Sequence, residues 1–110
     1  MEIDAALMSL AALAQPTRLE AFRLLVRHEP AGLAAGDLAR ALAVPQNTLS
    51  AHLNVLAHSE LVVARRKGRS VVYRANITRA RTLADFLVED CCAGAGCAAA
   101  SPGLCVETAK

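Results

Sequence analysis

Hydrophobic positions recur at helical spacing through the first half of the chain. Proline and glycine interrupt that spacing where helices are expected to begin or end. A proline suits a first helical turn because its missing N–H has no partner within the helix there. Helices are predicted over residues 4–14, from Pro16 to the stop at Pro30 and Gly32, over 35–42, and from Pro45 or Gln46 to 58.

Each predicted helix has an apolar stripe, and two of the helices are joined by a very short turn. Residues 43–45 separate the third helix from the fourth, which is the spacing of a helix-turn-helix unit. The expected inward-facing residues are Leu7, Leu10, Ala11 and Ala14, then Leu19, Phe22, Leu25 and Val26, then Leu38 and Leu42, and finally Leu49, Leu53 and Leu56.

The period changes after the fourth helix from helical to alternating. Residues 62–67 and 70–75 are β-branched runs joined at Gly68-Arg69, which predicts a β-hairpin. A last helix should start after Asn76, with Thr78 as a candidate N-cap. Its expected apolar stripe comprises Ala80, Leu83, Phe86 and Leu87. The chain is therefore predicted to be mainly α with one β-hairpin.

Composition narrows the function classes. The chain has 110 residues, enough for one domain, and 55% are hydrophobic but only 3% aromatic. Small apolar side chains favour closely packed helices and leave little bulk for a deep catalytic pocket, so we expect no enzyme. Residues 1–13 have no basic leader, and no apolar run is long enough for a membrane span. We therefore expect a cytoplasmic protein without a membrane partner.

The fourth helix and the hairpin carry complementary chemistry. The helix face opposite Leu49 has amide and hydroxyl side chains, which can both donate to and accept from base edges in a major groove. The hairpin gathers cations that can neutralise phosphates. Either feature alone is also typical of an ordinary solvated surface, but their direct succession favours binding to double-stranded DNA. The residues concerned are Gln46, Asn47, Thr48, Ser50, Ala51, Asn54 and His58 on the helix and Arg65, Arg66, Lys67 and Arg69 on the hairpin.

Three segments in this order resemble the ArsR/SmtB family of metal-sensing repressors: QPTRLEAFRLL, GDLARALAVPQNTLSAHLNVLAHSELV and RRKGRSVVYRA. The resemblance runs from about Leu10 to Leu87. It implies a winged helix-turn-helix homodimer, with the first and last helices at the dimer interface, that represses until a metal or metalloid binds. By position it implies operator contacts from Gln46, Asn47, Thr48 and Ser50, and wing contacts from Lys67 and Arg69, which Arg65 joins by its charge.

Dimerisation also follows from the thin core expected of so short a chain. Apolar faces on the first and last helices would stay exposed in a monomer, and pairing them across a two-fold axis buries them. The same axis would present two reading helices to a pseudo-palindromic operator, about one helical turn apart. The predicted division is a DNA-binding and dimerisation domain over residues 1–92 and a flexible, cysteine-containing tail over residues 93–110.

The four cysteines cluster near the end of the chain. Cys91 and Cys92 are adjacent, and the glycines that follow would allow Cys97 to fold back towards them. Three thiolates without a histidine suit a trigonal, thiophilic ion such as As(III) or Sb(III) better than tetrahedral zinc. Some arsenite-responsive family members are similar here. That resemblance implies Cys91, Cys92 and Cys97 as metalloid ligands, with Cys105 as a spare or alternative third ligand.

Other family sites lack their ligands in this sequence. The third helix has no Cys-x-Cys pair, and the last helix has acidic residues but no histidine for zinc. The function that we expect is a repressor released from operator DNA by trivalent arsenic or antimony. Two alternatives stay open: a repressor of the same fold that responds to thiol oxidation, because adjacent cysteines can oxidise, and a metal-handling protein that uses the cysteine tail.

Overall fold

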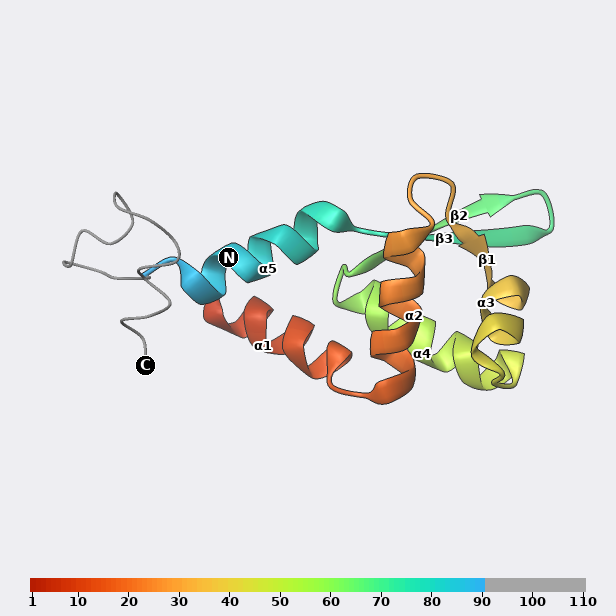
Figure 1. The fold of residues 1–110 in the computed structure, drawn as a ribbon, viewed down its shortest axis with the longest axis horizontal. Helices are drawn as coiled ribbons and strands as arrows, with labels where there is room; N and C mark the ends of the chain where they lie inside the picture. Colours follow the sequence, from red (N-terminus) through yellow and green to blue (C-terminus); the bar gives the residue numbers. More distant parts are fainter. Residues whose placement is uncertain (91–110) are drawn as a thin grey trace.

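The computed structural model describes residues 1–90, which form five helices and three short strands. Figure 1 shows α1 and α5 side by side at one end and the hairpin of β2 and β3 at the other. The elements are α1 (Ile3–Leu13), α2 (Pro16–Arg27), β1 (Leu33–Ala34), α3 (Ala35–Leu42), α4 (Gln46–His58), β2 (Val62–Lys67), β3 (Ser70–Ala75) and α5 (Ile77–Val88). No helix within residues 1–90 has both the length and the apolar character needed to cross a membrane.

The turn between α3 and α4 is set by two backbone conformations. Ala43 has a φ of 57°, the left-handed conformation that ends α3, and its N–H bonds back to the carbonyls of Ala39 and Arg40. Pro45 then occupies the N-cap of α4 in an extended conformation, which its ring favours. The two helices are therefore joined by a turn of three residues, as the predicted helix-turn-helix requires.

The hairpin has the predicted bounds, and a short strand is added to it. β2 and β3 pair antiparallel from Val62 opposite Ala75 to Lys67 opposite Ser70. β1 pairs with the other edge of β3, so that the strand order is β1-β3-β2. Two residues are too few to give a readable alternation, which is why the sequence did not reveal β1. Its effect is to attach the segment before α3 to the base of the wing.

The hydrophobic core lies between α2, α3, α4 and the base of the sheet. Its leucines come mainly from the predicted stripes, and all three stripe residues of α4 are fully buried. This packing orients α4 because one whole side of the helix is committed to the core, leaving the opposite side free. The fully buried leucines are Leu25, Leu38, Leu49, Leu53, Leu56 and Leu61.

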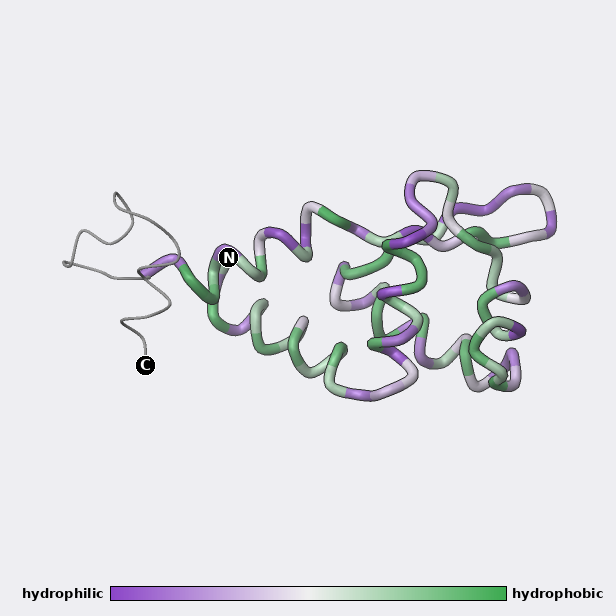
Figure 2. Tube along the Cα trace, in the orientation of Figure 1, coloured by the Kyte–Doolittle hydropathy of each residue, from purple (hydrophilic) through white to green (hydrophobic). Residues whose placement is uncertain are grey.

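The stripes predicted for the outer helices differ from what the single chain buries. In α1 the buried residues are Ala6, Ser9 and Ala12, while the predicted Leu7 and Leu10 face outwards. Of the predicted α5 stripe only Leu83 is buried, and Leu87 is 58% exposed. Leu19 and Val26 of α2 are also exposed. α1 and α5 thus bury few or small side chains and expose larger apolar ones; Figure 2 shows that both helices are largely hydrophobic along their length.

One predicted cap is wrong. Asn76, not Thr78, occupies the N-cap position of α5, where its side-chain oxygen accepts a hydrogen bond from the N–H of Arg79 at 3.2 Å. The Asn76 amide also donates to the carbonyl of Glu60, at the end of α4, over 3.0 Å. Asparagine is therefore favoured here because it caps α5 and ties that helix to the segment that follows α4.

Candidate nucleic-acid interface

The predicted reading side chains lie on the outer side of α4. Gln46, Asn47 and Thr48 are exposed in its first turn, and Ser50 is half-buried. The Asn47 side-chain oxygen accepts a hydrogen bond from the N–H of Thr48 at 2.9 Å, so its amide group keeps both N–H donors available. The fully buried leucines on the other side of α4 prevent the helix from turning this face inwards.

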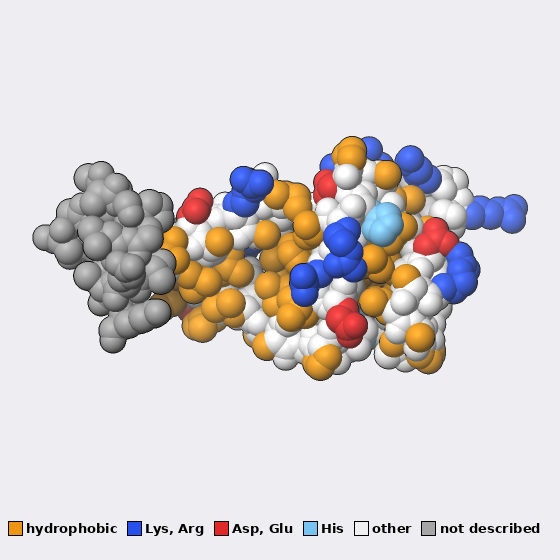
Figure 3. All heavy atoms as spheres, viewed as in Figure 1, with side chains coloured by type: hydrophobic (Ala, Val, Ile, Leu, Met, Phe, Trp, Pro, Cys, Tyr) orange, Lys and Arg blue, Asp and Glu red, His pale blue; other side chains and the backbone are white. Residues whose placement is uncertain are grey.

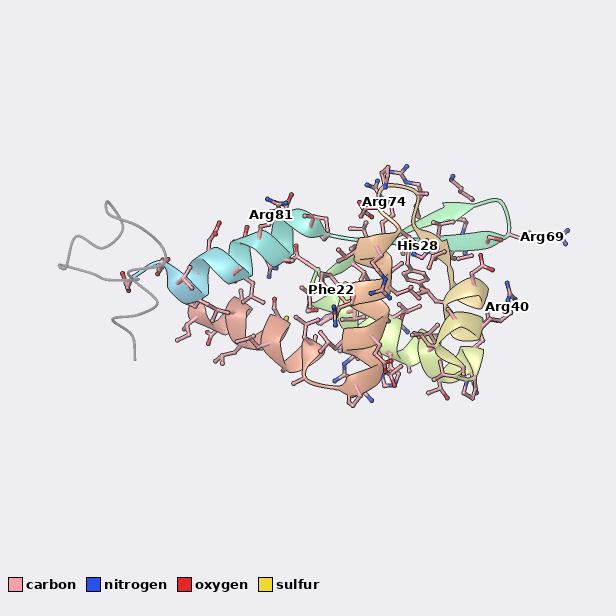
Figure 4. All side chains as sticks on the ribbon, in the orientation of Figure 1. Phe22, His28, Arg40, Arg69, Arg74 and Arg81 are labelled. Carbon is pink, nitrogen blue, oxygen red and sulfur yellow. The ribbon has the colours of Figure 1, made fainter. Side chains whose placement is uncertain are left out.

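The wing separates its cations onto two faces. In the pleat of β2, Arg65 and Lys67 point to one side and Arg66 to the other. Arg66 stands directly opposite Val71 of β3, and directly opposed residues share a face. The wing cations are exposed, and among residues 1–90 none of them pairs with a carboxylate. Figure 4 shows Arg69 extending from the tip of the wing.

A small polar cavity joins the reading helix to the wing. It has a volume of about 290 Å³ and brings together parts of α3, α4 and β3 that are distant in the sequence. Val71 lines it, so Arg66 lies on the face of the wing that looks towards α4. The sequence grouped Arg66 with the other wing cations and did not assign it a separate face. The alternation of side chains along β2 was the signal that could have done so. The lining residues are Ala34, Ala35, Gly36, Gln46, Ser50, Arg69, Ser70, Val71 and Tyr73.

An ion pair fastens the base of the wing to the loop after α2. Arg74 donates to both carboxylate oxygens of Glu29, at 2.8 and 3.2 Å, and Figure 4 shows Arg74 beside that loop. The hydrogen bond and charge of Arg74 hold the pKa of Glu29 below its ordinary value, against a smaller opposing effect of burial. Arg74 therefore serves the fold, and its charge is not available to DNA in the way that the charges of the wing cations are.

Gly32 brings the same loop against β3. Its φ is +78°, and a Cβ there would lie 2.5 Å from the carbonyl oxygen of Tyr73. Only glycine gives both the backbone conformation and the close approach. The loop therefore fixes where β3 leaves the core, and with it the position of the wing relative to α4.

The predicted metalloid ligands Cys91, Cys92, Cys97 and Cys105 lie outside the described residues, as does the predicted boundary between residues 92 and 93. Within residues 1–90 there is no group of three His, Cys, Asp or Glu side chains that could hold a metal ion. α5, the last described helix, ends at Val88, shortly before the first cysteine in the sequence.

Comparison with known proteins gives a consistent picture. Residues 13–65 match a family described as a helix-turn-helix domain. The chain is 33% identical over 67 residues to the transcriptional repressor SdpR of Bacillus subtilis (strain 168), a match that covers 61% of this chain and 71% of SdpR.

Solved structures share the fold over most of the chain. An ArsR-like transcriptional regulator from Rhodococcus sp. RHA1 superposes with a TM-score of 0.69 and 30% identity, covering 78% of each chain. The homodimeric winged helix-turn-helix DNA-binding domain of Mb0332 from Mycobacterium bovis, a possible ArsR-family regulator, gives 0.66 and 30%, covering 80% of this chain and 82% of that one. HlyU from Vibrio cholerae N16961 gives 0.65 and 29%, covering 84% and 99%. With the α4 reading face and the basic wing in place, the chain belongs to the ArsR-like family of winged helix-turn-helix, DNA-binding transcriptional regulators.

Proposed function

We propose that the protein is a homodimeric repressor that binds a pseudo-palindromic operator through α4 and the wing. The observation that carries this proposal is the cavity at which the neutral polar face of α4 meets the wing. Gln46, Asn47, Thr48 and Ser50 read base edges in the major groove, where amides and hydroxyls discriminate base pairs. Arg65, Arg66, Lys67 and Arg69 bind phosphates, which supplies affinity without sequence preference.

The dimer is supported by the apolar outer faces of α1 and α5. Figure 3 shows hydrophobic side chains gathered over this half of the molecule. An exposed apolar surface of this kind marks an interaction site on a small protein. A second copy is the partner that would also supply a second reading helix, as a pseudo-palindromic site needs. The largest exposed fractions are those of Ile3 at 65%, Val88 at 61%, Leu87 at 58% and Leu7 at 57%.

The signal that we propose is trivalent arsenic or antimony bound by Cys91, Cys92 and Cys97. Three thiolates match the soft, trigonal preference of these ions. Because the cysteines follow α5 directly, drawing them together would remodel the end of a dimerisation helix and move the subunits relative to each other. A coupling free energy of about 1–3 kcal/mol between the two sites would lower operator affinity roughly 5- to 150-fold.

Operator binding is tested by fluorescence anisotropy with the promoter DNA upstream of the gene and a scrambled duplex of equal length. Asn47→Ala should weaken binding to the promoter more than to the scrambled duplex, because it removes a base contact. Arg66→Ala should weaken both alike and reduce the slope of log affinity against log salt by about 1. Arg81→Ala, on the exposed face of α5, is the matched control and should change neither. Equal affinity of the wild type for both duplexes would contradict the proposal.

Metalloid binding is tested separately on the purified, reduced protein by following the near-ultraviolet absorption of metal–thiolate bonds. We expect one As(III) per subunit, and an affinity loss of more than about 10-fold in Cys91→Ser, Cys92→Ser and Cys97→Ser. Cys105→Ser is the informative comparison, since it leaves the proposed three ligands intact. Binding that needs Cys105 but not Cys97 would reassign the third ligand, and no As(III) binding would contradict the sensor proposal.

A further inference from the structure

A second cavity lies between α1 and the second half of α4, and Asn54 and His58, which the sequence grouped with the reading face, line it. Its volume is about 480 Å³, and it has apolar walls with a cation among them. Met8 of α1 and Val55 of α4 both line it and are 49% and 41% exposed. The lining residues are Met8, Ala11 and Ala12 of α1, Arg18 of α2, Asn54, Val55 and His58 of α4, and Ser59.

Arg18 is a half-buried cation at this cavity. Its Nε donates to the carbonyl of Ala12 at 2.6 Å, and its Nη1 lies 3.3 Å from Nδ1 of His52. Within residues 1–90 no carboxylate pairs with it. A partly buried guanidinium beside apolar walls favours an anion that can pair with its charge. The cavity is therefore complementary to an apolar group that carries a negative charge.

The start of α1 presents that chemistry on its own outer surface. Asp4 is exposed and has no ion-pair partner in the part of the chain that the structure describes. Asp4, Met8 and Ala11 have the spacing i, i+4, i+7 and so share one face of α1. Beside them lie Ile3 and Leu7, both more than half exposed. One end of this face is thus acidic and apolar, and the other end borders the cavity of Arg18.

We propose that α1 packs antiparallel against α1 of the partner subunit, so that each Asp4 pairs with Arg18 of the partner subunit. A two-fold contact centred near Met8 would place residue 4 of one helix opposite residue 12 of the other, because residues rise evenly along a helix. The apolar side chains beside Asp4 would then fill the α1–α4 cavity of the other copy. The proposal rests on the homodimer proposed above and names its contacts.

This contact would link the dimer interface directly to the reading helix. Asn54, Val55 and His58 of α4 form one wall of the cavity, and most of the reading residues lie in the first turn of the same helix. A shift of the partner subunit in this cavity would therefore move α4 as a rigid body. The Arg18–His52 contact holds the same helix to α2.

Charge reversal tests the pairing between subunits. In the Asp4→Arg homodimer two arginines would meet at each contact, and in the Arg18→Glu homodimer two carboxylates would meet. Each variant should therefore dimerise about 10-fold more weakly than the wild type. Mixed together, the two variants restore both pairs in one heterodimer. Native mass spectrometry of a mixture, with one variant carrying a mass tag, should show heterodimers in excess of the statistical half.

Controls separate this proposal from folding and from dimerisation itself. Glu2→Arg makes the same charge change at the same helix end but on another face, and should leave dimerisation unchanged. Circular dichroism checks that each variant is folded. If Arg18→Glu does not fold, Asp4→Asn should still flatten the salt dependence of dimerisation.

The outcomes distinguish the Asp4–Arg18 contact from the homodimer on which it rests. Heterodimers in excess would support the Asp4–Arg18 contact. A statistical mixture of folded variants, or an unchanged salt dependence in Asp4→Asn, would overturn it and leave the homodimer standing. A wild-type protein that stays monomeric at all concentrations would overturn both.

Discussion

The two halves of the molecule complete their hydrophobic packing differently. In the reading half (α2, α3, α4 and the sheet), large leucines are fully buried within one chain. In the dimer half (α1 and α5), the fully or nearly fully buried residues are mostly small, while Leu7 and Leu87 stay more than half exposed. The reading half therefore has a hydrophobic core that is complete within one chain, and its surface carries the polar groups proposed to contact DNA. The dimer half leaves apolar side chains exposed, which a second copy would bury. Dimerisation would then be needed for high-affinity DNA binding.

The largest expected effect is in the core of the reading half. Leu53 is fully buried, and Leu53→Ala should lower the free energy of unfolding by about 2–5 kcal/mol, through lost burial and the cavity left behind. Leu87→Ala is the matched control in the dimer half and should have little effect on the monomer. Chemical denaturation at low protein concentration measures both. Equal losses of unfolding free energy in the two variants would contradict the difference between the reading half and the dimer half.

The next effect concerns assembly. Leu7→Glu places a charge in the apolar face of α1, and we expect it to weaken dimerisation by roughly 100-fold, or about 2.7 kcal/mol. Sedimentation at several concentrations should show monomers with unchanged circular dichroism. Operator affinity should fall in parallel. A variant that still dimerises like the wild type would show that α1 is not at the interface.

Two glycines, Gly32 and Gly68, test whether the loop after α2 holds the wing in place. Gly32 and Gly68 both have positive φ, so alanine strains either backbone by about 1–2 kcal/mol. A Cβ at Gly32 would also collide with the carbonyl oxygen of Tyr73, whereas a Cβ at Gly68 would have no described atom within 4 Å apart from its own chain neighbours. Gly32→Ala should therefore destabilise the protein more than Gly68→Ala, measured as the midpoint of thermal unfolding. The reverse order would contradict the proposed anchoring role of the loop.

The smallest expected effect is a pH dependence of the reading half. Because Arg74 holds the pKa of Glu29 below its ordinary value of about 4.3, the pair stabilises the folded state above that value. Its contribution should be lost as the pH falls from that value through the lower, folded-state pKa. Glu29→Gln should remove this part of the acid sensitivity while leaving the neutral-pH fold intact. Unfolding curves that keep the same acid dependence in Glu29→Gln would assign it to other carboxylates.

The sequence predicted α3, α4 and the hairpin well because their pattern is complete within one chain, whereas it placed Leu19 and Val26 of α2 in the core and missed β1. The stripe of Leu49, Leu53 and Leu56 and the bounds of both hairpin strands are confirmed. The short turn between α3 and α4 is confirmed too. Each of these features depends on neighbours close in the sequence or on a strict period, which local reasoning can use.

The sequence was less informative where burial or bonding depends on distant partners. Leu7 and Leu87 look like core positions by periodicity, but a single sequence does not say which copy would bury them. The cap of α5 is a different case, because asparagine is by type a better N-cap than threonine and the sequence already favoured Asn76 over Thr78. Only its bond to the carbonyl of Glu60, after α4, depends on distant structure. The face on which Arg66 lies could be assigned only from the strand register. The cavity at Arg18 could be found only once α1, α2 and α4 were placed in space.

The proposed response couples the two halves of the molecule: metalloid bound by the cysteines that follow α5 should release DNA held by α4 and the wing. The direct measurement is anisotropy of a labelled promoter duplex bound by the full-length protein, titrated with As(III), Sb(III), Zn(II) or peroxide. The account predicts release by the trivalent metalloids alone, with the response lost in Cys91→Ser and Cys97→Ser although both still bind DNA. Release by zinc or peroxide instead, or release by As(III) that persists in both variants, would contradict it.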